Sequence, residues 1–131
     1  MTNLYANLTE ILILAFLFIT FIQSSFDKLL DWKGNAMWLK EHFSQTFVKS
    51  FVELSMVLIV LLELICSAFC VVGIVYLISN DDPFYGRLGA LSACIILLCL
   101  LFGQRIAKDY DGARTIAIYF IIAVFGVYLL Q

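Results

Sequence analysis

The chain has 131 residues, of which 63% are hydrophobic and 14% are charged, and its formal net charge is −2. Soluble domains average roughly 25% charged residues and at most about half apolar residues. The composition therefore excludes an ordinary water-soluble domain and predicts an integral membrane protein. No basic tail or patch is present, so we expect no nucleic-acid partner.

The first hydrophobic segment covers residues 8–30. A helix rises 1.5 Å per residue and needs about 20 residues to cross a bilayer, so this segment predicts a first transmembrane helix. Gln23, Ser24 and Ser25 are polar residues in its last third. Because small polar residues allow close helix contacts, we expect this part to face neighbouring helices.

The connection that follows contains an amphipathic pattern over residues 36–47. Its apolar residues share one helical face: Ala36, Leu39, Phe43 and Phe47, with Trp38 on the flank. The spacing predicts a short helix, and in a membrane protein such a helix lies in the interface, parallel to the bilayer. A helix that binds a partner is the alternative.

The second hydrophobic segment covers residues 51–77, and Glu63 is the only charged residue deep within it. A carboxylate at that depth costs at least about 2.5 kcal/mol. Small residues on roughly the same face predict that Glu63 points into a helix bundle: Cys66, Ser67, Cys70 and Gly73. We expect a neutral or hydrogen-bonded Glu63, with Ser67, Ser92 or Thr20 as its partner.

Residues 87–104 and 113–130 form the third and fourth hydrophobic segments. The predicted fold is thus all-α, a single membrane domain over residues 1–131. It is a four-transmembrane-helix bundle with one interfacial amphipathic helix in the first loop. The third segment opens with small residues that resemble the small face of the second, so these two helices are expected to pack together.

Seven of the eight basic residues lie in the first and third connections. The positive-inside rule places these two connections in the cytoplasm and both chain termini on the outer side of the membrane. Loops carry partner contacts more often than lipid-facing helices do. The candidate contact residues on the cytoplasmic side are five: Trp38, Phe43, Phe47, Lys108 and Arg114.

The four cysteines lie in the second and third segments: Cys66, Cys70, Cys94 and Cys99. Buried free cysteine behaves as a small apolar packing residue. A redox pair between the two segments stays open as an alternative, although no C-x-x-C motif is present. His42 is the only histidine, so no metal site is expected.

Two short stretches resemble the DoxX family of small bacterial membrane proteins. One is residues 21–29, with Lys28 and Leu29 after two serines, and the other is residues 61–65 around Glu63, with Gly73 downstream. Residues 31–43 are similar to a branch found in Bacteroidota-type bacteria. The resemblance implies a four-helix protein of the bacterial inner membrane in which Glu63 and Lys28 are family motif positions.

The resemblance leaves three functions open. The first is a small non-catalytic accessory subunit of a larger membrane complex, with other integral membrane subunits and lipid as partners. The second is the membrane subunit of a quinone-linked oxidoreductase of the thiosulfate:quinone type, in which Glu63 carries protons beside Phe16, Phe18 and Tyr119. This function would need a quinone, whereas the residues alone indicate no cofactor. The third is a transporter or channel, with Glu63 as its only support.

Overall fold

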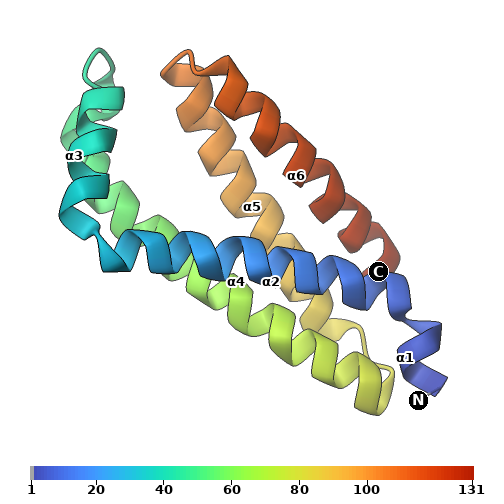
Figure 1. The fold of residues 1–131 in the computed structure, drawn as a ribbon. Helices are drawn as coiled ribbons and strands as arrows, with labels where there is room; N and C mark the ends of the chain where they lie inside the picture. Colours follow the sequence, from blue (N-terminus) through green and yellow to red (C-terminus); the bar gives the residue numbers. More distant parts are fainter. Residues whose placement is uncertain (1) are drawn as a thin grey trace.

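The chain folds into helices joined by short turns, and the computed structural model describes residues 2–131. The protein is 90% helical and contains no strand within the described residues, which confirms the all-α prediction. The elements in chain order are α1 (Thr2–Ala6), α2 (Leu8–Leu30), α3 (Trp32–His42), the 3₁₀ helix η1 (Phe47–Phe51), α4 (Val52–Asn80), α5 (Phe84–Ile106) and α6 (Tyr110–Leu130) (Figure 1).

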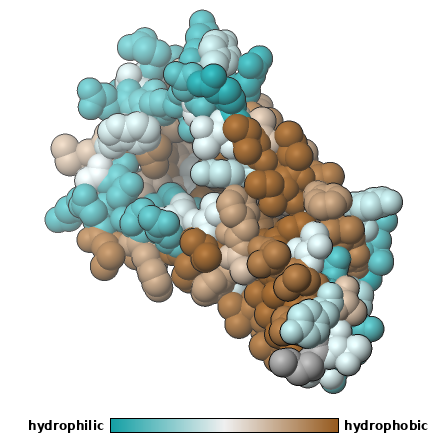
Figure 2. Space-filling view, turned by 45° about the vertical axis from the view of Figure 1, so that its right-hand side comes forward, coloured by the Kyte–Doolittle hydropathy of each residue, from teal (hydrophilic) through white to brown (hydrophobic). Residues whose placement is uncertain are grey.

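Four of the helices are long and apolar enough to cross a membrane: α2, α4 with its preceding η1, α5 and α6. Figure 2 shows hydrophobic residues over the middle of the molecule, with hydrophilic residues gathered toward its ends. This arrangement fits a multi-pass membrane protein. The helix α5 begins at Phe84, earlier than the expected residue 87, because Pro83 and the Asp82 side chain start it there.

Short polar side chains determine where several helices begin. The carboxylate of Asp31 accepts a hydrogen bond from the Gly34 N–H at the start of α3. The carboxylate of Asp109 accepts one from the Gly112 N–H at the start of α6. Such caps satisfy backbone donors that have no partner within the helix. At the end of α4, Asp81 adopts the left-handed conformation with φ of 54°.

Glycines bring α4 and α5 into backbone contact. A Cβ atom added to Gly73 would lie 2.5 Å from the Cα of Gly86, closer than real Cβ contacts. Farther along the same interface, the Cys66 thiol donates a hydrogen bond of 3.3 Å to the Gly89 carbonyl. The expected packing of these two small-residue faces is therefore confirmed. At Gly73 it leaves no room for a side chain between the helices.

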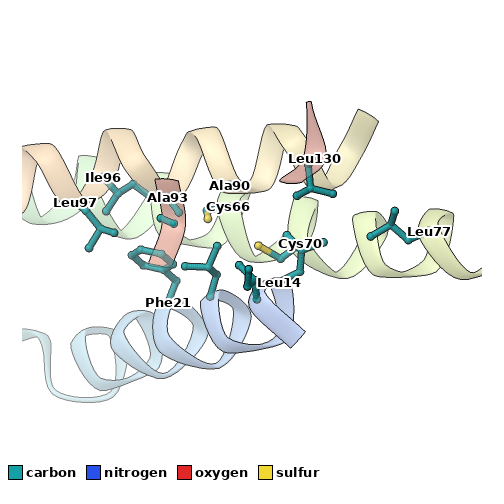
Figure 3. Packing of buried hydrophobic residues seen from close by; sticks show 13 residues of the cluster. Leu14, Phe21, Cys66, Cys70, Leu77, Ala90, Ala93, Ile96, Leu97 and Leu130 are labelled. Atoms are coloured by element: carbon teal, nitrogen blue, oxygen red, sulfur yellow. The ribbon is translucent and has the colours of Figure 1, made fainter. Parts of the chain in front are cut away.

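The core is formed where α2 lies across α4 and α5. Figure 3 shows Leu14 and Phe21 of α2 pointing toward the Cys66 and Cys70 face of α4 and the Ala93 face of α5. Near its N-terminus, α2 also touches α6, because a Cβ at Gly126 would lie 2.9 Å from a methyl group of Ile13. Toward its C-terminus, α2 diverges from α5 and α6 (Figure 1).

The predicted amphipathic helix over residues 36–47 was wrong in its bounds. The helix α3 spans Trp32–His42, and a turn follows before Thr46 caps η1 by accepting a hydrogen bond from the Val48 N–H. The sequence predicted one helix through residue 47, whereas in the structure α3 ends at His42 and the Thr46 cap begins the separate helix η1. Ala36 of α3 is buried with Val52 and Met56 of α4. Protein, and not lipid alone, therefore covers the apolar face of α3.

We predict that Gly73→Ala destabilises the protein, because the new methyl group would meet the backbone of Gly86. Overpacking of this kind costs about 1–3 kcal/mol. Thermal unfolding in detergent would measure the loss. Gly103→Ala is the matched control, since its Cβ would lie 3.5 Å from the Phe43 ring, an ordinary contact. Equal melting temperatures for the two variants would contradict the close approach of α4 and α5.

Candidate functional site

A buried ion pair joins the end of α2 to the middle of α4. The Lys28 Nζ lies 3.1 Å from the Glu63 Oε1, and the Glu63 side chain is fully buried while that of Lys28 is 18% exposed. Lys28 stands in the last turn of α2, where the helix dipole favours a cation. Glu63 therefore faces the helix bundle, as its small neighbours predicted, and it meets an opposite charge there.

Two serines of α2 complete the surroundings of the pair. The Ser24 Oγ lies 2.6 Å from the Lys28 Nζ, one turn earlier on the same helix. The Ser25 hydroxyl is fully buried, donates to the Phe21 carbonyl and lies 3.5 Å from the Glu63 Oε2. No buried side-chain nitrogen or oxygen in residues 2–131 lacks a hydrogen-bond partner. Both charges are thus held by surrounding polar atoms, as a buried pair requires.

The three expected hydroxyl partners of Glu63 were wrong. Ser67 donates to the backbone carbonyl of Glu63 at 2.8 Å, not to its carboxylate. Thr20 donates to the Phe16 carbonyl and Ser92 to the Leu88 carbonyl, each one turn back on its own helix. Hydroxyl groups within helices commonly make this local bond. Lys28 fills the role in their place, and Ser67 remains a buried polar residue next to the site.

A cavity of about 410 Å³ opens beside the ion pair, where α2 diverges from α5 and α6. Its polar lining comes mainly from α2 and includes the side chain of Lys28. Leu97, Leu100 and Ile116 supply an apolar wall from the other two helices, and Tyr119 adds a hydroxyl group. Glu63 does not line the cavity, so Lys28 stands between it and any occupant.

Gln23 also borders this cavity, but it is exposed and is not enclosed by the helix bundle. The expectation that it faces neighbouring helices is therefore only partly met. No hydrogen bond within residues 2–131 involves the Gln23 amide or the Tyr119 hydroxyl. These two groups are free to bind a polar ligand. The volume lies within the range of roughly 300–1,000 Å³ typical of small-molecule sites.

The five expected contact residues differ in how far they are exposed. Trp38 and Phe47 are 58% and 71% exposed, whereas Phe43 is half-buried against the α3–α4 cluster and the backbone of Gly103. Lys108 is exposed in the turn between α5 and α6, and Arg114 pairs with its neighbour Asp111 on α6. Phe43 is thus a packing residue, and the other four stay available to a partner.

His42, at the end of α3, links the connection between α2 and α4 to the connection between α5 and α6. Its Nε2 lies 3.6 Å from an oxygen of Asp109 and 3.4 Å from the Gln104 Oε1. The ring of Trp38 stacks on that of His42 with 4.7 Å between centroids. No group of three metal-ligating residues occurs in the part of the chain that the structure describes. His42 here serves to join the ends of α3 and α5.

All four cysteines are free thiols, and they differ in access. Cys66 and Cys70 are buried, Cys94 is half-buried and Cys99 is exposed. The two buried thiols pack in the core between α4 and α5. Their position agrees with a packing role, and a redox role stays a hypothesis.

No protein-family model, curated protein or solved structure matches the chain. The resemblance to the DoxX family thus rests on the sequence motifs around Lys28 and Glu63.

We predict that Lys28→Met lowers the free energy of unfolding by about 3–5 kcal/mol, because it leaves Glu63 buried without its partner. Glu63→Gln should also destabilise, and the double variant should lose less than the sum, with a coupling of about 0.5–3 kcal/mol. Denaturation in mixed micelles would measure all three. Lys33→Met, at an exposed lysine of α3, is the control. Additive losses would mean that the pair does not join α2 to α4.

Proposed function

We propose that this chain is a small accessory subunit of a larger complex in the bacterial inner membrane, with both termini on the periplasmic side. One observation carries the proposal. Trp38 of α3 and Phe47 at the start of η1 stay exposed, by 58% and 71%. Large exposed aromatic side chains in a polar setting are typical of contact surfaces.

The charges around these aromatic residues support a protein partner. Lys108 lies exposed in the turn between α5 and α6, and Arg114 lies exposed near the start of α6. The His42–Asp109 contact holds the turn beside α3. An acidic or aromatic surface of another subunit fits such a mixture of rings and cations. The seven-to-one distribution of basic residues further supports a cytoplasmic position for this end.

We predict that Trp38→Ser with Phe47→Ser releases copurifying subunits while the four long helices stay folded, because both side chains are exposed. Affinity purification of the tagged chain followed by mass spectrometry would measure the loss. Tyr5→Ser is the matched control, because Tyr5 is 71% exposed on α1, at the opposite end of α2. Phe43 is unsuitable for this test because it packs inside the protein. Subunits that still copurify with the double variant would show that the contact surface lies elsewhere.

The cavity favours a second function, the membrane subunit of a quinone-linked oxidoreductase. Tyr119 lines the cavity with Lys28, and the Phe16 ring lies edge-on to Tyr119 with 5.8 Å between centroids. A quinone ring offers carbonyl oxygens to the Lys28 ammonium group and the Tyr119 hydroxyl. Because Glu63 lies behind Lys28, it would carry protons only by way of Lys28. Phe18 packs against the core and does not line the cavity.

For this second function we predict that Tyr119→Phe lowers the quinone content of the purified protein severalfold, since it removes one donor from the cavity. Extraction and chromatography of bound quinone would measure it. Tyr128→Phe is the control, because Tyr128 is 69% exposed near the end of α6 and lies outside the cavity. If neither the wild-type protein nor any variant contains bound quinone, this function is excluded, and the proposed accessory role is unaffected.

A further inference from the structure

A second cavity, of about 600 Å³, lies where α3, η1 and the start of α4 meet. Two lysines and one glutamate line it, Lys40, Lys49 and Glu53. The sum of their charges is +2 − 1, which leaves one net positive charge. Neither the ion pair of Lys28 nor the contacts of Trp38 explain this cavity.

Lys40 and Lys49 differ in whether they form an ion pair. The Lys40 Nζ lies 2.8 Å from the Glu53 Oε1, and both side chains are largely exposed. Lys49 forms no ion pair within residues 2–131. Exposed ion pairs contribute little to stability, so an incoming anion can share Lys40 at small cost. The cavity therefore offers two cations to an anion, and Glu53 competes with it.

One exposed apolar side chain borders the same cavity. Phe47 lines it and is 71% exposed, and Phe51 and Leu54, which do not line it, follow within seven residues and are 55% and 58% exposed. All three belong to the beginning of the membrane-length helical segment Phe47–Asn80. An occupant whose head is anionic and whose body is apolar would satisfy both parts of the site. A free anion would leave the exposed rings in water.

We infer that this cavity binds the phosphate headgroup of an anionic phospholipid, with the acyl chains leaving the cavity past Phe47. The lysines neutralise the phosphate, and the start of α4 marks the depth at which the headgroup ends and the chains begin. Basic residues beside a membrane helix at the surface of an anionic leaflet each add to the attraction for anionic lipid.

The test measures equilibrium binding of phosphatidylglycerol and of phosphatidylcholine to the full chain in detergent micelles. Lys40→Gln with Lys49→Gln should weaken phosphatidylglycerol binding by roughly tenfold. The matched control is Lys33→Gln with Lys108→Gln, which removes the same charge from exposed lysines outside the cavity and should change binding little. Glu53→Gln should strengthen binding severalfold, because it removes the competing carboxylate from Lys40.

Several results would overturn the inference. One is equal weakening in the two double variants, which would indicate charge attraction without a site. Another is weaker or unchanged binding of phosphatidylglycerol to Glu53→Gln. This variant keeps both lysines, so it tests the inference even if the double lysine variant fails to fold. Equal affinity for phosphatidylcholine would overturn it as well. Competition by inorganic phosphate at the same concentration as the lipid would show a phosphate site without a role for the acyl chains.

Discussion

The pair of Lys28 and Glu63 is the interaction on which the arrangement of α2 depends. A carboxylate placed midway along a membrane-length helix cannot stay alone in an apolar setting. The structure brings Lys28 to it across 35 positions of sequence, at a distance of 3.1 Å. To do so, the last turn of α2 must lie against the middle of α4. The position of α3 follows from this, because α3 begins directly after that turn.

Apolar packing alone could not fix this position. Leu14, Leu17 and Phe21 would fit many small rotations of α2 against α4 and α5, since dispersion contacts have little direction. The ion pair and the two serines allow far fewer orientations of α2, because hydrogen bonds require defined distances and angles. The same geometry holds Lys28 at the wall of the cavity between α2 and α6. The polar pair thus sets both a helix position and the chemistry of a site.

The sequence predicted the parts that follow from local patterns. Four apolar stretches of sufficient length predicted the four long helices, and the small residues after Glu63 predicted the face that packs on α5. The preference of helical hydroxyls for the carbonyl one turn back is also local. It could have excluded Ser67, Thr20 and Ser92 as partners of the carboxylate.

Other features depend on how helices cross, which the sequence does not state. Lys28 stands at the end of one predicted helix and Glu63 near the middle of another, so no spacing rule pairs them. Their contact requires the crossing of α2 over α4 seen in Figure 1. The cavity has the same origin, since its lining joins Lys28 with residues about 70 to 90 positions later, such as Leu97 and Tyr119. The bounds of α3 and η1 did have local signals, the Asp31 cap before α3 and the Thr46 cap before η1.

Unequal contact along α2 has a mechanical consequence as well. Near its N-terminus Ile13 lies against Gly126, whereas the cavity lies between the C-terminal part of α2 and the helices α5 and α6. Under lateral pressure the space between α2 and these two helices narrows most easily at this end, because no apolar residue of α2 beyond Phe21 belongs to the core.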